Sequence, residues 1–197
     1  VAFDPAGPTF RHEAFEAYKA QRESTPEDIK KAVPYIKTLL KAYNIPIYEV
    51  SGYEADDVIG TLAKQAAKQG FTVYMLTPDK DYGQLVEENI FMYRPKHSGG
   101  YEILGVEEVK AKYGLENQAQ VIDLLGLMGD SSDNIPGCPG VGEKTALNLV
   151  QTYKNIDNLY AHVEELKGKL KERVIADKET AFLSRTLATI DTACGVD

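Results

Sequence analysis

The sequence contains no tryptophan and, among its 197 residues, only two cysteines and three histidines. Cys138 and Cys194 form no CxxC pair, which argues against a disulfide scaffold and a zinc site and fits a reducing compartment. His12, His97 and His162 are scattered, so we expect neither a catalytic triad nor a histidine-rich metal centre. With so few soft ligands, any metal bound by this chain should be held mainly by oxygen atoms.

Long apolar runs are also missing. No segment approaches the roughly 20 apolar residues that a membrane-spanning helix needs, so we expect a cytoplasmic, monomeric protein without a membrane partner. The chain starts at Val1 without a methionine, and we expect it to be a piece of a longer polypeptide. A chain of this length can bury a substantial core in one large or two small domains.

Basic residues are outnumbered, with 22 Lys and Arg against 30 Asp and Glu and a net charge of −8. This balance at first argues against a nucleic-acid partner. However, eight acids fall in four short groups, and without them the acids number 22, as many as the bases. If those eight bind divalent cations, the remaining surface is neutral and can carry local basic patches. The eight predicted metal ligands are Asp4, Glu54, Asp56, Asp57, Asp79, Asp81, Asp130 and Asp133.

Three of these acidic groups follow predicted strands, at residues 1–4, 47–50 and 72–77. Ligands of open α/β sheets bind beyond the C-terminal ends of the strands, so the acids should converge on one rim. Many carboxylates without His or Cys suit Mg²⁺ or Mn²⁺, and two such ions can clamp a phosphodiester and activate water. A second interpretation stays open for the middle group: Ser51-x-x-Glu54 has the form of a capping box, and the acids after it would then complement the helix dipole.

Residues 10–22 are predicted to form one helix, with Arg11, Phe15, Tyr18 and Arg22 on one face and Lys19 beside them. A basic face interleaved with aromatic rings suits contacts with phosphates and bases. A solvated amphipathic helix has the same spacing and, on spacing alone, is the more common outcome.

The segment Pro136–Gly142 contains two prolines and three glycines and precedes a predicted helix. Its glycines let the backbone approach a partner closely, and the helix start presents free N–H groups with Lys144 in the first turn. Such a helix N-terminus can bind a phosphate without contacting a base. An ordinary connection between two helices is the alternative.

Strands and helices alternate up to about residue 104, and the rest of the chain is almost entirely helical. We therefore predict an α/β domain at 1–104 with a mostly parallel sheet flanked by helices, and a small all-α domain at 105–197. The helices predicted in the second part span residues 106–113, 118–128, 143–153 and 164–187.

Taken together, the motifs resemble the 5′-to-3′ exonuclease domain of bacterial DNA polymerase I, within the flap endonuclease family. The similar segments cover essentially the whole chain in the same order, although Cys138 stands where the family pattern leads us to expect Val. They are Phe3-Asp4, Phe10-Arg11, Tyr18-Lys19-x-x-Arg22, Tyr53-Glu-Ala-Asp-Asp57, Thr77-x-Asp-Lys-Asp81 and Met128–Ala146.

The resemblance implies a PIN-like, resolvase-like nuclease domain with a helical arch, followed by a helix-three-turn-helix domain of the helix-hairpin-helix kind. It implies a two-metal phosphodiesterase that cuts DNA or RNA primers at 5′ flaps and nicks in replication and repair. Lys19 and Arg22 would be catalytic, and the hairpin would hold a K⁺ ion through backbone carbonyls. The DNA-binding residues it implies are Arg11, Tyr18, Lys19, Arg22, Gly137, Gly140, Val141, Gly142, Lys144 and Thr145.

The resemblance also implies segments on both sides of this chain. A polymerase portion would follow Asp197, and roughly 60 residues with a central strand and a further metal-ligand Asp would precede Asp4. Without that strand the sheet and the metal site would be incomplete. The alternative expectation is therefore a fragment that binds duplex DNA but does not cut it.

Overall fold

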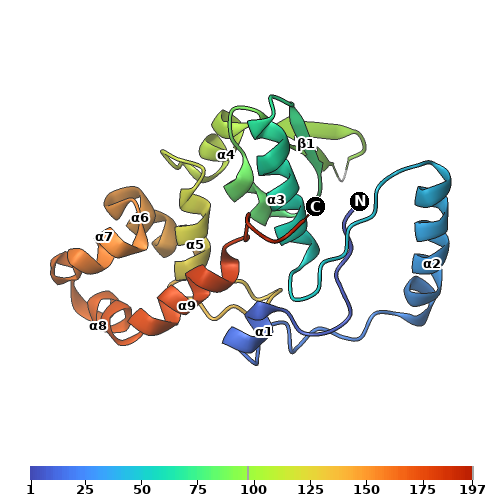
Figure 1. Cartoon of the computed structure of the whole chain (residues 1–197). Coiled ribbons are helices and arrows are strands. Elements are labelled where there is room, and N and C mark those ends of the chain that lie inside the picture. The colour runs from blue at the N-terminus through green and yellow to red at the C-terminus, as the bar shows by residue number, and fades with distance from the viewer. Residues whose placement is uncertain (97, 197) are drawn as a thin grey trace.

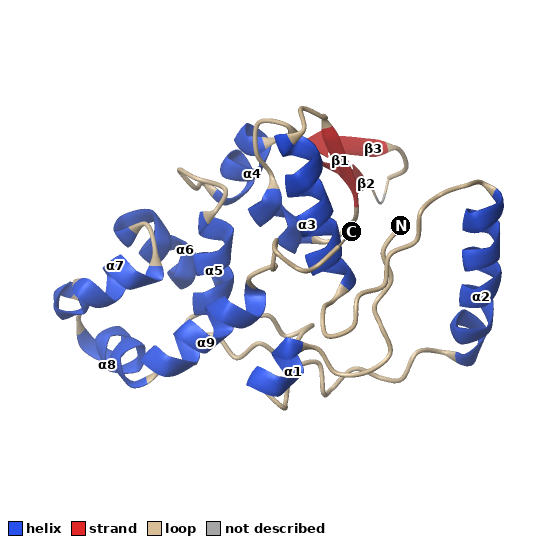
Figure 2. Ribbon diagram, in the orientation of Figure 1, coloured by secondary structure: helices blue, strands red, loops and turns tan. Residues whose placement is uncertain are grey.

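The computed structural model describes residues 1–96 and 98–196. A three-stranded sheet forms the centre of the first half, with strands β1 (Val73–Leu76), β2 (Ile90–Pro95) and β3 (Tyr101–Leu104) in that order (Figure 2). β1 and β2 run parallel, whereas β2 and β3 run antiparallel, so the sheet is mixed. Met75 and Met92 are buried while Tyr74 and Leu76 are exposed, as expected for a sheet that has only one covered face. Helix α3 (Ala55–Lys68) packs against β1 and β2.

The strands predicted at residues 1–4 and 47–50 pair with each other and do not join this sheet. They share a single parallel bridge between Ala2 and Tyr48, supported by hydrogen bonds from Phe3 N to Tyr48 O and from Tyr48 N to Val1 O, each 2.9 Å. This pairing places the carboxylate of Asp4 beside the start of α3, where it accepts a hydrogen bond from the backbone N–H of Ala55 at 2.8 Å.

The prediction of one helix over residues 10–22 is wrong beyond the first turn. α1 covers only Phe10–Ala14, Phe15 is extended with φ −150°, and Lys19 has a left-handed φ of 55°. The chain instead docks on the loop after residue 130: Lys19 N donates to Asp133 O at 2.9 Å, and Asn134 Nδ2 donates to Ala17 O at 2.6 Å. These tertiary hydrogen bonds replace the helical ones that the spacing predicted.

Helix α2 (Glu27–Ala42) stands apart from the rest of the molecule, joined to it by extended segments on both sides (Figure 1). None of its residues is buried, and several of its large apolar side chains, including Ile29, Tyr35 and Leu39, are exposed. Its position matches the helical arch that the resemblance implies. No helix in the described part of the chain is long and apolar enough to cross a membrane.

The second half is helical, and α5 lies at its centre. Its helices are α4 (Val106–Tyr113), α5 (Gln120–Met128), α6 (Glu143–Tyr153), α7 (Ile156–Ala161), α8 (Gly168–Ala176) and α9 (Lys178–Ala188). The helix predicted over 164–187 is in fact two, separated at Asp177, and α7 was not predicted. α5 packs against α9 so closely that a Cβ on Gly126 would lie 2.9 Å from Arg185 Cβ, which explains a glycine inside a helix.

The end of the chain returns to the first half. In Figure 1 the C-terminal end lies next to α3. After α9, Ile190 N donates to Gln84 Oε1 at 2.8 Å, and Cys194 Sγ lies 3.1 Å from the hydroxyl of Thr61 in α3. One hydrophobic core therefore runs through both halves, from Met92 in the sheet through Leu124 in α5 to Leu187 in α9.

Candidate metal centre and nucleic-acid interface

Carboxylates from three separate segments meet around a small cavity between the two halves. Its volume is about 20 Å³, and Glu54, Asp56, Asp81 and Asp133 line it together with Arg11 and Tyr18. A polar cavity of this size holds one water-sized particle. Asp79 accepts a hydrogen bond from Asp81 N at 2.9 Å and so lies beside this residue. The structure thus brings four of the eight predicted ligands to one cavity, whereas Asp4 and Asp79 do not line it.

Asp81 is the carboxylate whose surroundings best suit a metal ligand. Its Oδ1 atom is buried and has no hydrogen-bond partner in the described part of the chain. Burial, followed by repulsion from Asp79, raises the pKa of Asp81 to about 7. A buried oxygen that lacks a donor and sits among other acids is a suitable ligand for a hard divalent ion.

Asp56 is in a similar position. Burial raises its pKa from 3.8 to about 6, repulsion from Asp79 adds to this, and a hydrogen bond of 2.6 Å from the hydroxyl of Tyr82 opposes it. Its carboxylate thus has one oxygen held by a neutral donor and lines the same cavity as Asp81. No cationic side chain forms an ion pair with either carboxylate within the described residues.

Three other predicted ligands, Glu54, Asp130 and Asp133, are paired with basic side chains. Lys19 Nζ lies 2.5 Å from Glu54 Oε1 and 3.6 Å from Asp133 Oδ2, and Arg22 also pairs with Asp133. Lys80 Nζ lies 2.7 Å from Asp130 Oδ2. Burial alone would raise the pKa of Asp130, but hydrogen bonds from Lys80 and Ser132 outweigh it and lower that pKa. In residues 1–96 and 98–196, no three His, Cys, Asp or Glu side chains are close enough to hold one ion.

Asp57 differs from its neighbours, and the structure contradicts its prediction as a direct metal ligand. The side chain is fully buried, and its two oxygens accept two hydrogen bonds from Arg11, at 2.7 and 2.8 Å. They also accept hydrogen bonds from Glu54 N at 2.9 Å and from Asp191 N at 2.8 Å. These four bonds fill the usual acceptor capacity of a carboxylate. Asp57 therefore caps α3 and joins it to α1 and the C-terminal segment.

Arg11 was predicted to contact DNA, and the structure contradicts this as well. Only 2% of Arg11 is exposed. Besides Asp57 and Glu54, its guanidinium donates to the carbonyls of Leu187 at 2.8 Å and Thr189 at 2.6 Å, so its five N–H groups are all used. Arg11 is a structural residue under the carboxylate cluster.

Tyr18 was predicted to stack on a base, but only 3% of it is exposed. Its hydroxyl lies 2.9 Å from Glu54 Oε2 and 3.1 Å from Asp133 Oδ2, so it links two predicted metal ligands from different halves. Burial, with the charges of Glu54 and Asp133, raises the pKa of this hydroxyl. The base-stacking role is therefore wrong for Tyr18 in this structure, whereas Lys19 and Arg22 do reach the acids.

The glycine-rich hairpin has an inner and an outer side. Gly137 and Val141 are on the inner side: Gly137 N donates to Ser184 Oγ at 2.9 Å, and the Val141 side chain is buried. A Cβ on Gly137 would lie 2.3 Å from Gly129 N, so this glycine is needed to close the loop that carries Asp130. The structure contradicts the prediction that these two residues contact DNA.

On the outer side, Gly140, Gly142 and Lys144 are exposed at the start of α6, and Thr145 is half-buried there. The backbone N–H groups of Gly142 and Lys144 have no acceptor within the part of the chain that the structure describes. Unpaired N–H groups at a helix start form a natural site for an anion. The predicted phosphate contacts at these residues stay a prediction.

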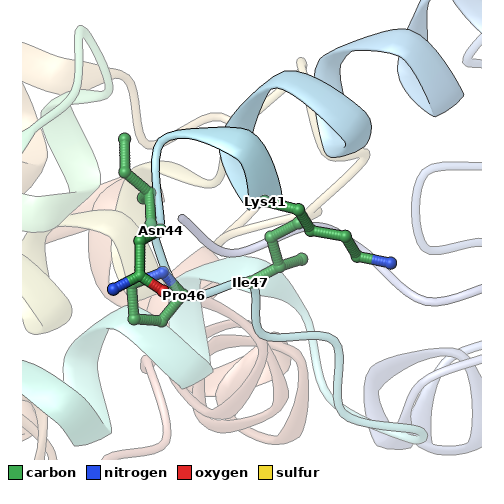
Figure 3. A pocket seen from close by; sticks show the side chains of 5 residues that line it. Lys41, Asn44, Pro46 and Ile47 are labelled. Atoms are coloured by element: carbon green, nitrogen blue, oxygen red, sulfur yellow. The ribbon is translucent and has the colours of Figure 1, made fainter.

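Two residues without a predicted role, Tyr82 and Lys80, contact predicted metal ligands. Tyr82 donates to Asp56, and Lys80 pairs with Asp130. Both are next to Asp81 in the sequence, and this adjacency was the only signal available. A larger hollow at the end of α2, about 310 Å³, lies elsewhere and is lined by Lys41, Asn44, Ile45, Pro46 and Ile47, without a carboxylate (Figure 3).

Comparisons with known proteins agree with this architecture. Residues 1–114 match the family described as 5′-3′ exonuclease, N-terminal resolvase-like domain, and residues 116–197 match the 5′-3′ exonuclease, C-terminal SAM fold. The chain is 46% identical over 192 residues to DNA polymerase I of Bacillus caldotenax, and 44% identical over 192 residues to the thermostable DNA polymerase I of Thermus thermophilus. These alignments cover 96% and 98% of this chain but 22% of each polymerase, so the chain spans about a fifth of their length.

Two solved structures have a similar fold. The T5 5′-exonuclease with bound zinc ions is 24% identical with a TM-score of 0.80, over 98% of this chain and 74% of that one. The catalytic core of Rad2 in complex with DNA substrate is 16% identical with a TM-score of 0.63, over 100% of this chain and 64% of that one. At these identities the likeness shows the fold alone. It confirms the predicted fold class, an α/β resolvase-like half followed by a helical half.

Proposed function

Because the chain belongs to the 5′-3′ exonuclease family, we propose that it hydrolyses phosphodiester bonds near the 5′ ends of nucleic-acid duplexes. The substrates are 5′ flaps, nicks and RNA primers paired to DNA, as in replication and repair. The observation that carries the proposal is the carboxylate-lined cavity, with the unpaired oxygen of Asp81 and two basic side chains, Lys19 and Arg22, at its edge. In the parent protein, the partner of this domain is a polymerase portion, in keeping with the relatives that it matches.

The residues present fit divalent cations, and we propose two ions of Mg²⁺ or Mn²⁺. Glu54, Asp56, Asp81 and Asp133 line the cavity and would hold one ion after moving closer together, because no three of the described acids lie close enough to do so in the structure. Asp4, Asp79 and Asp130 would offer oxygens for a second ion. When bound, such ions make water a nucleophile near neutral pH and neutralise charge on the phosphate. The hydroxyl of Tyr18 donates a hydrogen bond to Glu54, and the hydroxyl of Tyr82 donates one to Asp56. These bonds fix the orientation of the two carboxylates.

Lys19 and Arg22 supply the positive charge that the chain itself brings to the phosphate. Both now pair with acids of the cluster, and Arg22 has a half-exposed side chain that can turn toward a ligand. Binding of cations by Glu54 and Asp133 would weaken these ion pairs, since the carboxylates would then have a stronger partner. The two side chains would be free to orient the scissile phosphate and stabilise the charge that develops on it.

The outer side of the hairpin, Gly140 to Thr145, would hold the duplex by its backbone. The free N–H groups of Gly142 and Lys144 suit a phosphate oxygen. Carbonyls of the hairpin would hold a K⁺ ion, which would supply further positive charge on this side of the molecule. Such contacts carry no base information. The rigid loop between Gly129 and Gly137 would set a fixed distance between the held duplex and the carboxylates.

Replacing Lys144 by Ala should weaken duplex binding by a similar factor for every sequence. It should also lower the slope of log affinity against log salt by about one, because one phosphate contact is lost. Fluorescence anisotropy at several salt concentrations, in Ca²⁺ or chelator to prevent cutting, measures both quantities. Lys154→Ala, which removes an exposed lysine at the far end of α6, is the matched control and should leave the slope unchanged. A loss that depends on sequence would contradict a backbone contact.

Metal should stabilise the fold more at pH 8 than at pH 5. The pKa values of Asp56 and Asp81 are raised to about 6 and about 7 in the folded chain, so the folded state holds more protons than the unfolded state between about pH 4 and pH 7. In chelator, the free energy of unfolding should therefore fall as the pH rises through this window. Saturating Mg²⁺ at 100 times its dissociation constant should restore about 2.7 kcal/mol. Urea unfolding with and without Mg²⁺ at both pH values tests this, and an equal effect at both would contradict it.

A second candidate function is duplex binding without cutting. It is favoured by the ion pairs that occupy Glu54, Asp130 and Asp133, because these carboxylates do not approach one another closely enough to share an ion as they stand. Incubating the chain with a 5′-flap duplex in Mg²⁺, and in parallel with chelator, decides between the two. Cleavage near the flap junction only in Mg²⁺ supports the nuclease; retention of the duplex without any cleavage supports the binder.

A further inference from the structure

A second cavity lies beside the carboxylate cluster and is lined by three basic side chains and two acids. It measures about 310 Å³, at the lower end of the roughly 300–1,000 Å³ found for small-ligand pockets. Its walls come from both halves of the molecule: the 3₁₀ helix η1 (Lys80–Leu85), strand β2, helix α4 and helix α5. Asp81 lines this cavity and the carboxylate cavity, so the two are neighbours.

Three basic side chains surround the opening: Lys80, Arg94 and Lys112. Lys80 is paired with Asp130, and Arg94 lies 3.8 Å from Glu102, near the limit for an ion pair. Lys112 forms no ion pair within the described residues. Burial, followed by repulsion from Arg94, lowers the pKa of Lys112, and attraction to Glu102 opposes this only in part. The two acids at the cavity, Asp81 and Glu143, do not pair with it.

The floor of the cavity is apolar. Val121, Leu124 and Leu125 of α5 are buried beneath it, and Met128 and the half-buried ring of Tyr113 form its side. A small inorganic anion would leave this surface in contact with water, and a purely apolar ligand would leave Lys112 without a counterion. The surface therefore suits a ligand with an anionic group at one end and a flat apolar group at the other.

We propose that this basic pocket binds a nucleoside 5′-monophosphate group, with the phosphate between Arg94 and Lys112 and the base against Tyr113 and Met128. This proposal rests on the proposed function only for the source of the nucleotide. This is either the free mononucleotide released by an exonuclease or the terminal nucleotide of a 5′-phosphorylated strand. Both present the same chemistry, and the pocket lies next to the cluster where such an end would be produced.

The three methionines of the chain allow a direct test. With ¹³C-methyl methionine, thymidine 5′-monophosphate should shift the resonance of Met128, at the pocket, and leave those of Met75 and Met92, buried in the sheet. The titration is run on the whole chain in excess chelator, so that no divalent cation links the phosphate to the carboxylates. If the chain does not cleave a flap duplex in Mg²⁺, binding of the mononucleotide can still be measured. If the mononucleotide does not bind, cleavage can still be measured, so the two proposals are tested independently.

Lys112→Ala and Arg94→Ala should each weaken binding of the mononucleotide about tenfold, the usual order for one charged hydrogen bond. Lys110→Ala is the matched control, because Lys110 lies on the same helix, pairs with Glu107 at 3.0 Å and does not line the pocket. The proposal is overturned if Lys110→Ala weakens binding equally, or if inorganic phosphate or unphosphorylated thymidine binds as tightly as the mononucleotide. A 5′-phosphorylated trinucleotide that binds more tightly than the mononucleotide identifies the strand end as the source; weaker binding identifies the free product.

Discussion

Replacing Asp81 by Asn should abolish cleavage of a 5′-flap duplex in Mg²⁺ while leaving the protein folded. The substitution keeps the shape of the side chain but removes the negative charge of the oxygen that has no partner in the structure. If Asp81 holds a cation, several kcal/mol of transition-state stabilisation are lost, which corresponds to a fall in rate of roughly 10²- to 10³-fold. Stability in chelator should rise at pH 8, because repulsion with Asp79, Asp130 and Asp133 disappears.

The contrast with Asp57 makes this prediction specific. Asp57→Asn also removes a predicted metal ligand, but here it breaks a buried ion pair with Arg11 and should lower stability. Cleavage rates from single-turnover kinetics, together with the free energy of unfolding from urea titrations, separate the two effects. If Asp81→Asn cuts normally, or if its loss of activity follows a loss of stability, Asp81 is not a metal ligand and the cavity is not the reaction centre.

The sequence predicted that acids from separate segments would gather, and Glu54, Asp56 and Asp81 do line one cavity. The sheet-edge rule accounts for Asp81, which follows β1, but not for Asp56, because the segment at residues 47–50 lies outside the sheet. The turns of the hairpin could also be predicted, since Gly137 and Gly140 have positive φ angles that favour glycine. Both features depend on local chemistry that can be read residue by residue.

The roles of adjacent acids could not be predicted in this way. Asp56 and Asp57 are neighbours in the chain, but successive residues of a helix point about 100° apart, and only the packing decides which direction is the interior. Asp56 lines the cavity, whereas Asp57 is enclosed by Arg11 and the C-terminal segment, about 130 positions further along the chain. A helical pattern gives the spacing of charged residues but not the partner that each one meets.

The prediction of one basic helix over residues 10–22 was wrong for a related reason. Arg11, Tyr18 and Arg22 have the spacing of one helical face, but a break after Ala14 sends Arg11 and Tyr18 inward and leaves Arg22 outside. The break is stabilised by hydrogen bonds to Asp133 and Asn134, more than 110 residues away, which no local pattern contains. The basic pocket has the same character, since Lys80, Arg94 and Lys112 belong to three elements that meet only in the folded chain.

Replacing Arg11 by Ala should cost the fold more than any other single change to a basic residue of the predicted DNA-binding set. The substitution leaves the fully buried carboxylate of Asp57 without its cation, and it removes the donors to Leu187 O and Thr189 O that tie the end of α9 to α1. Removing one partner of a buried ion pair costs about 3–5 kcal/mol. For a chain of this size that corresponds to a fall in Tm of roughly 6–20 °C.

Arg22→Ala is the matched comparison, because Arg22 is the arginine of the same segment whose side chain is half exposed. An exposed pair contributes about 0–1 kcal/mol, so this variant should keep its Tm and lose cleavage rate instead. Arg11→Lys should fall between wild type and Arg11→Ala, since lysine restores the charge but cannot supply five donors in a plane. Calorimetry, together with duplex binding measured well below each Tm, tests the set. Arg11→Ala with normal Tm and weakened duplex binding would contradict the structural role and restore Arg11 as a DNA contact.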